Sequence, residues 1–271
     1  MVQPISSLIK DSWNVYRKNF AKILLAVIAV WIPLIIIQVV LIDPSIKLDG
    51  VDEILQNQEL IGTPEYEDAA AVMMRTGAIY MAATLLISFL GLVSDIIITK
   101  VADKSHKSEN FKVSTSFGDM FSDSVAVLPR CIWIVVLTAL LTVFGLMMFF
   151  LPGIYIYIMS SLAVTAAVLV GVKGMKAIKM SFAVIGREFF TILIVLLIFI
   201  VVDSLIISGV DLINTVLPDN RIIHSVSNGF VMLFEQFIQS FRIVMLTVFF
   251  ADRFKVLNSE HPKDTVLGAE L

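Results

Sequence analysis

The feature that most constrains this fold is an almost entirely apolar run at residues 131–172, interrupted only by Leu151-Pro152-Gly153. A helix needs about 20 residues to cross a hydrocarbon core, so the run is about twice as long as one crossing requires. Proline lacks an amide hydrogen and glycine accepts unusual backbone angles, so together they favour a helix end and a chain reversal. The run therefore predicts two spans, 131–151 and 154–172, with a hairpin turn at Pro152 and Gly153. One long kinked helix is the alternative, because proline is tolerated within membrane helices.

Composition supports a membrane protein and argues against several kinds of site. Of the residues, 58% are hydrophobic and the mean hydropathy is +0.92, which is more apolar than soluble domains are. The single cysteine, Cys131, excludes an internal disulfide and a cysteine-based metal cluster. His106, His224 and His261 lie far apart on opposite predicted sides, which argues against a histidine metal site. We expect no metal and no cofactor.

Hydropathy predicts an all-α, six-span membrane domain over residues 1–255. A loop at 43–68 contains many Asp and Glu against one base, Lys47, and is expected outside, because inner loops are rich in Lys and Arg. Most Lys and Arg fall on the other side, which places both termini in the cytoplasm, with a flexible cytoplasmic tail at 256–271. The expected spans are 20–42, 76–98, 131–151, 154–172, 190–212 and 229–250.

Amphipathic helices are predicted in front of spans 1, 3 and 5. At 5–20 and 173–189 apolar residues recur at helical spacing with basic residues on other faces, and a weaker pattern surrounds Phe117. Such helices lie in the membrane interface, where basic side chains attract anionic headgroups. An ordinary positively charged inner loop is the alternative. The predicted contacts with anionic lipid are Lys173, Lys176, Lys179 and Arg187.

Small residues recur every fourth position within span 4, at Ala163, Ala167 and Gly171. Such a row lets a neighbouring backbone approach closely, so we expect this face to pack inside the bundle. A chance lipid-facing row is the alternative.

An internal repeat relates the segments before spans 1 and 5. Residues 9–24 align with residues 178–193 at an offset of 169, matching Val15 to Val184, Lys18 to Arg187 and Phe20 to Phe189, among others. We predict three tandem units, each an in-plane helix followed by a two-span hairpin. Chance similarity between amphipathic segments is the alternative.

Several polar residues interrupt the predicted spans, where ionisable groups are costly. Glu235, Gln239 and Arg242 form one stripe on span 6, Asp203 lies in span 5, and Asp95 lies near the inner end of span 2. The structural interpretation pairs Arg242 with Asp203 first and Asp95 second, connecting spans 5 and 6. The functional interpretation is a path for a proton, an ion or an amphiphile. A third alternative is that Arg242 extends its charged group to the edge of the bundle and stays solvated there.

Three short motifs are distributed over nearly the whole chain. They are Ser12-Trp13-x-x-Tyr16-x-x-Asn19-Phe20; Leu151-Pro152-Gly153-Ile154-Tyr155 with Lys176-Ala177-x-x-Met180-Ser181-Phe182; and Phe249-Phe250-Ala251-Asp252-Arg253. These motifs resemble those of the YciC-like family of bacterial inner-membrane proteins, and of the similar membrane domain fused to some glycerophosphodiester phosphodiesterases. The resemblance implies six helices in a bacterial plasma membrane. It supplies no catalytic residues, and the chain has no room for a phosphodiesterase domain, so that activity is not inferred.

Two functions from different classes follow. The sequence contains no G-x-S-x-G, G-x-x-x-x-G-K-[ST], H-E-x-x-H or G-x-G-x-x-G motif, so we expect no enzymatic activity. The favoured prediction is a non-catalytic protein that organises membrane lipids, or a protein partner, at the cytoplasmic face, without nucleic acid. The alternative is a small transporter or exporter that uses Asp203, Glu235 and Arg242 between spans 5 and 6. It predicts a cavity open to at least one side.

Overall fold

The computed structural model describes residues 5–38, 51–108, 113, 115–216 and 221–260, and the regular structure in these ranges is helical. Six helical segments are long and apolar enough to cross a membrane, which is compatible with a multi-pass integral membrane protein. The elements are α1 (Ile5–Lys18), α2 (Phe20–Ile37), α3 (Val51–Gln56), the short 3-10 helix η3 (Gln58–Leu60), α4 (Pro64–Lys107), α5 (Phe117–Met148), α6 (Phe150–Ser160), α7 (Ala163–Val170), α8 (Met175–Ile185), α9 (Phe189–Val216) and α10 (Arg221–Glu260).

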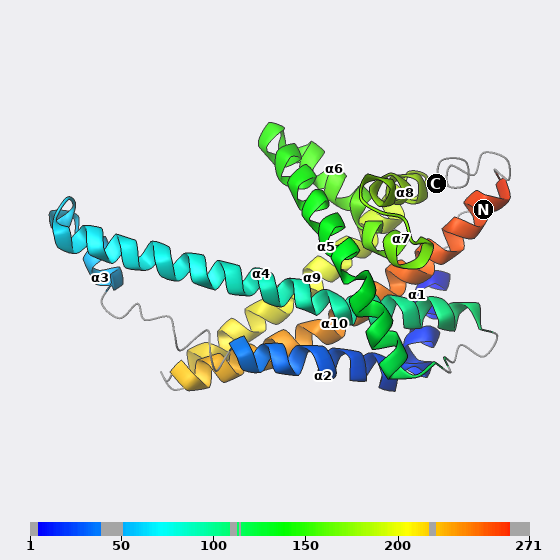
Figure 1. The fold of residues 1–271 in the computed structure, drawn as a ribbon, viewed down its shortest axis with the longest axis horizontal. Coiled ribbons are helices and arrows are strands. Elements are labelled where there is room, and N and C mark those ends of the chain that lie inside the picture. Colours follow the sequence, from blue (N-terminus) through cyan, green and yellow to red (C-terminus); the bar gives the residue numbers. More distant parts are fainter. Residues whose placement is uncertain (1–4, 39–50, 109–112, 114, 217–220, 261–271) are drawn as a thin grey trace.

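The long helices α2, α4, α9 and α10 run broadly along the long axis of the molecule, whereas α5 and α6 lean away from it (Figure 1). Helix α2 packs against α4, α5 against α6, and α9 against α10, while α4 and α10 also pack against each other and α2 packs on both. Helix α1 crosses this bundle and contacts α10 and α4. The core thus combines contacts between consecutive helices with contacts of α10 to α1, α2 and α4, which are distant from it in sequence.

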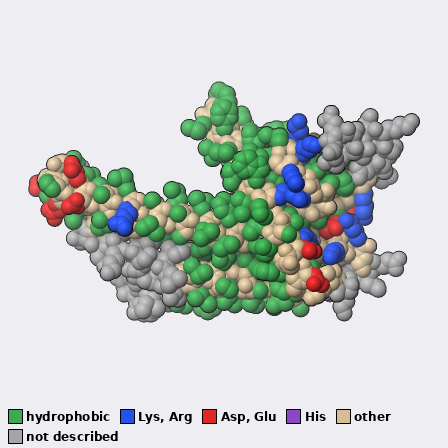
Figure 2. Space-filling view, viewed as in Figure 1, with side chains coloured by type: hydrophobic (Ala, Val, Ile, Leu, Met, Phe, Trp, Pro, Cys, Tyr) green, Lys and Arg blue, Asp and Glu red, His purple; other side chains and the backbone are tan. Residues whose placement is uncertain are grey.

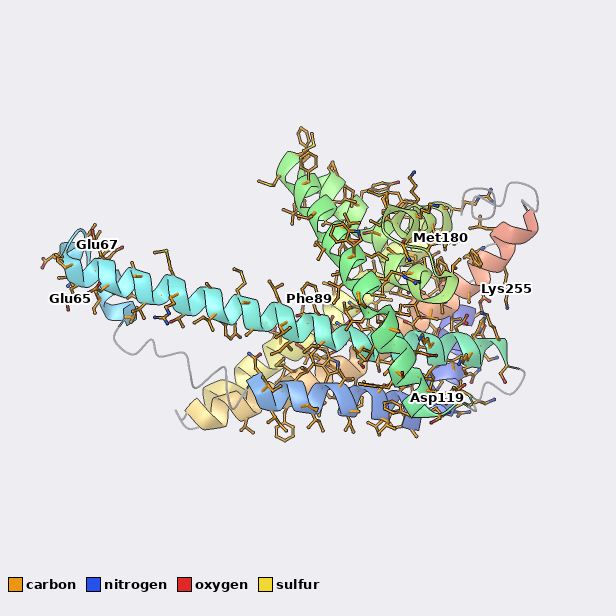
Figure 3. The ribbon with its side chains drawn as sticks, in the orientation of Figure 1. Glu65, Glu67, Phe89, Asp119, Met180 and Lys255 are labelled. Atoms are coloured by element: carbon orange, nitrogen blue, oxygen red, sulfur yellow. The ribbon has the colours of Figure 1, made fainter. Side chains whose placement is uncertain are left out.

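Charge is distributed unevenly between the two ends of the molecule. Figure 2 shows acidic side chains at the tip of α4 and most of the visible Lys and Arg at the opposite end, with a broad apolar surface between them. Glu65 and Glu67 mark the α4 tip and Lys255 the other end in Figure 3. A chain with an apolar belt between two polar ends matches the layers of a bilayer.

The chain reversal after span 3 is not where the sequence predicted it. Phe149 adopts an extended conformation (φ −159°, ψ 143°) between α5 and α6, while Pro152 and Gly153 lie within the first turn of α6. Proline is tolerated there, because the first amides of a helix have no intrahelical acceptor. A Cβ on Gly153 would lie 2.6 Å from the backbone nitrogen of Leu146, so this glycine allows two helices to approach closely and does not form the turn.

Span 4 is broken into α6 and α7, a feature that the sequence analysis missed. The Ser181 hydroxyl of α8 donates to the Met159 carbonyl (2.6 Å) and accepts from the Leu162 amide (3.1 Å). Backbone groups at the break are thereby satisfied inside the membrane-spanning segment, which low-dielectric surroundings require.

Only two of the three residues in the predicted small-residue row are buried. Ala163 and Ala167 are buried, with 1% and 0% of their surface exposed. Gly171 is exposed and adopts φ +83° at the C-terminus of α7, a conformation that glycine accepts at little cost. Gly171 therefore ends the helix and does not extend the packing face.

Three predicted boundaries also differ. Helix α5 runs without interruption from Phe117 to Met148 through Pro129, so no separate helix precedes span 3. Its first part stays against the protein through Met120, which is 1% exposed. Helix α10 continues to Glu260, so residues 256–260 of the predicted tail are helical, and 261–271 lie outside the described residues. Of the acidic segment, 51–60 contains α3 and η3, and 43–50 lies outside the described residues.

Candidate functional site

A partly open cavity of about 500 Å³ lies among α4, α5, α6, α7, α9 and α10. Its walls are mostly apolar, but two charged side chains and several hydroxyls line it. Val143 and Tyr157 belong to the lining and are 53% and 45% exposed at the surface of the bundle. The polar residues that line the cavity are Asp95, Thr99, Thr138, Thr142, Tyr157, Ser160, Ser161, Thr165 and Arg242.

Arg242 of α10 and Asp95 of α4 are the charged groups of this cavity, and they attract each other electrostatically. Among the described residues, neither side chain forms an ion pair within 4.0 Å or a hydrogen bond. The expected ion pair between Arg242 and Asp203 is therefore wrong. The second expected partner, Asp95, is the acid that shares the cavity with Arg242.

Asp203 has a different neighbour. The Gln239 side-chain amide donates to Asp203 Oδ2 at 3.1 Å, connecting α10 to α9. Glu235 lies close enough to Asp203 for the two carboxylates to interact. The stripe predicted on span 6 is thus divided, with Glu235 and Gln239 directed to α9 and Arg242 directed to the cavity.

The hydroxyls of the cavity wall were missed by the sequence analysis. Thr138 and Thr142 are one helical turn apart on α5, and Ser161 lies at the break between α6 and α7. Their hydroxyl oxygens are buried, and each lacks a hydrogen-bond partner among the described residues. The available signal was the repeat of Ser and Thr at helical spacing inside apolar runs, but such residues also bond to their own helix, as Ser160 does to Ile156 (2.7 Å).

The basic residues predicted to contact lipid lie outside the cavity, on a surface around α8. Lys173, Lys176, Lys179 and Arg187 are all exposed, on α8 or beside its ends. The opposite face of α8 is buried through Ile178 and Ile185, which are 3% and 0% exposed. We define these four basic residues as the basic surface.

The C-terminal part of α10 carries a polar network that the sequence analysis assigned only to a motif. Arg253 pairs with Glu188 at 2.6 Å, and both side chains are largely buried. The adjacent Asp252 lies 2.7 Å from His106 of α4. Two consecutive residues of α10 therefore connect it to α4 and to the start of α9.

Comparisons of the chain with protein-family models, curated proteins and solved structures find no match. The resemblance to the YciC-like family rests on the sequence motifs and stays a prediction.

Proposed function

We propose that this chain is a non-catalytic integral membrane protein that contacts anionic lipid at the cytoplasmic face of a bacterial plasma membrane. In this proposal the membrane-spanning segments anchor the protein, and the basic surface meets the headgroups. Membership of the YciC-like family is part of the same proposal, since the resemblance implies that location.

The observation that carries the proposal is the arrangement of α8. Its apolar face packs into the bundle, so the helix is held in place, while all four cations of the basic surface remain exposed. A basic residue near an anionic membrane surface contributes about 1 kcal/mol of attraction. Four such residues on one short segment favour anionic lipid over zwitterionic lipid.

Helix α1 supports the same orientation. Leu8 and Val15 are buried against the bundle, whereas Trp13 and Ile9 are 52% and 42% exposed. An exposed tryptophan beside basic residues such as Arg17 is typical of an interfacial anchor. We propose that α1 and α8 both lie at the inner headgroup layer.

The test measures how much phosphatidylglycerol the purified protein retains, by native mass spectrometry. Replacing Lys173, Lys176, Lys179 and Arg187 with Gln is expected to lower retention at least tenfold, because the attraction of about 1 kcal/mol per cation is lost. The matched control changes the three lysines to Arg, which keeps the charge and should keep the lipid. Equal retention by the Gln variant would contradict the proposal.

The cavity favours a second candidate, a transporter for a small polar or amphiphilic molecule. The transporter hypothesis requires a cavity open to at least one side, and the cavity beside Arg242 is partly open. Its walls come mainly from α4, α5, α6, α7 and α10. This cavity differs from the transport site predicted between spans 5 and 6, because Arg242 lines it but Asp203 and Glu235 do not.

A further inference from the structure

The cavity contains two opposite charges, Arg242 and Asp95, that attract each other without forming a direct ion pair. Arg242 and Asp95 both line it without a hydrogen bond or ion pair to another described residue. Ionisable groups inside membrane spans usually pair with each other or mark a ligand pathway. A ligand that offers one negative and one positive group would satisfy both side chains.

The hydroxyls of the cavity wall would also form hydrogen bonds with such a ligand. Thr138, Thr142 and Ser161 present buried oxygens that have no partner in the described part of the chain. A hydroxyl can donate one hydrogen bond and accept others, so it suits an oxyanion beside a guanidinium. Ser161 also marks the break between α6 and α7, and interrupted membrane helices commonly form binding sites.

The remainder of the cavity is apolar and reaches the outside of the bundle. Leu92, Leu196 and Leu246 line it together with Val143, which is 53% exposed at the surface. Figure 2 shows hydrophobic side chains over the α5 and α6 projection and over the body from which it leaves. A ligand bound here can place a polar group inside and hydrocarbon along the walls.

We propose that the cavity binds a phospholipid headgroup that carries both a phosphate and an ammonium group. The phosphate lies against Arg242 with hydrogen bonds from Thr138, Thr142 and Ser161, and the ammonium lies against Asp95. The acyl chains leave past Val143 into the bilayer. This inference gives the second candidate function its ligand class, and it rests on that cavity without requiring that the lipid be moved.

The test uses the purified full-length protein in detergent, titrated with phosphatidylethanolamine and read by native mass spectrometry. Arg242→Gln is expected to lower the affinity about tenfold, equivalent to ~1.4 kcal/mol. Asp95→Asn is expected to lower affinity for phosphatidylethanolamine but not for phosphatidylglycerol, because only the former carries an ammonium group. Arg75→Gln, on the exposed outer part of α4, is the matched control and should bind as the parent does.

A second variant separates binding from folding. Because the hydroxyls of Thr138 and Thr142 have no hydrogen-bond partner among the described residues, changing both to Val should leave the melting temperature of the lipid-free protein unchanged or raised. The same change should weaken phosphatidylethanolamine binding severalfold. Thr84→Val, at an exposed position of α4 outside the cavity, is the control.

Three results would overturn the proposal. Parent affinity in both Arg242→Gln and the double Thr variant would show that the lipid does not bind in the cavity. An Asp95→Asn variant that still prefers phosphatidylethanolamine would exclude ammonium recognition. If soluble phosphoethanolamine displaces the lipid and binds with the same affinity, the ligand of the cavity is a water-soluble molecule and not a lipid. Phosphatidylglycerol retention by the basic surface is measured separately, so failure of either proposal is recognised independently.

Discussion

At the scale of residues, three polar contacts each connect one helical segment to a residue near the C-terminal end of a later helix. Asn19 donates to Ser105 of α4 at 2.7 Å. Arg130 donates to the Gly171 carbonyl, just after α7, at 2.9 Å. Glu188 pairs with Arg253 of α10 at 2.6 Å. Each pair fixes two helical segments against each other.

We expect the pair between Glu188 and Arg253 to contribute strongly to stability. Glu188→Gln leaves a largely buried guanidinium without its carboxylate, which costs about 3 kcal/mol of unfolding free energy. The measurement is unfolding in mixed micelles with increasing dodecyl sulfate.

Asp103→Asn is the matched control, because Asp103 pairs with Lys107, which is 56% exposed. An exposed pair is worth at most about 1 kcal/mol, so this variant should resemble the parent. A similar effect in both variants would show that burial does not strengthen the Glu188 pair.

The sequence identified the polar residues inside the spans but not their partners. Glu235, Gln239 and Arg242 share a helical stripe, yet only Gln239 bonds to Asp203, and Arg242 faces the cavity. The rotation of α10 relative to α9 decides this division, and that rotation depends on packing between distant helices. Pattern within a single helix does not contain that information.

At the scale of elements, the first and third units share a pattern of burial at the offset of 169 residues. This common pattern is what tandem units predict, because equivalent positions then face equivalent neighbours. The second unit differs, since α5 is continuous from Phe117. The matched positions, all buried, are Leu8 and Ala177, Ser12 and Ser181, Val15 and Val184, Tyr16 and Ile185, Asn19 and Glu188, Ile23 and Ile192, Ala26 and Val195, and Val30 and Phe199.

The contact between α5 and α6 supplies a prediction for an element. Gly153→Ala forces a Cβ to within 2.6 Å of the Leu146 nitrogen, so the two helices must separate, at a cost of about 1–3 kcal/mol. Gly77→Ala, at a helical position where a Cβ meets nothing within 4 Å, is the control and should not destabilise. Unfolding midpoints in mixed micelles measure both, and equal midpoints would refute a close-packing role for Gly153.

Helix positions were more predictable than their ends and breaks. Apolar length located the six spanning segments, because crossing a bilayer sets a minimum length. The turn at Phe149 brings Gly153 of α6 against Leu146 of α5, and the break after Ser160 depends on Ser181 of α8, which contacts it from elsewhere in the fold. A local pattern of Pro and Gly indicated an interruption but placed it a few residues late.

At the scale of the whole molecule, the proposed function depends on which end faces the cytoplasm. The acidic tip of α4 and the basic surface beside α8 lie at opposite ends of the apolar belt (Figure 2). Lys and Arg are retained on the inner side of membranes, so the basic surface is expected inside. The proposed contact with anionic lipid of the inner leaflet requires this orientation.

Cysteine labelling in intact cells tests that orientation most directly. Cys131, which is buried, is first changed to Ala, and a sole cysteine is then introduced as Glu67→Cys or Lys179→Cys, both at exposed positions. A membrane-impermeant maleimide should label the Glu67→Cys protein in intact cells and the Lys179→Cys protein only after permeabilisation. Labelling of Lys179→Cys in intact cells would place the basic surface outside and contradict the proposed function.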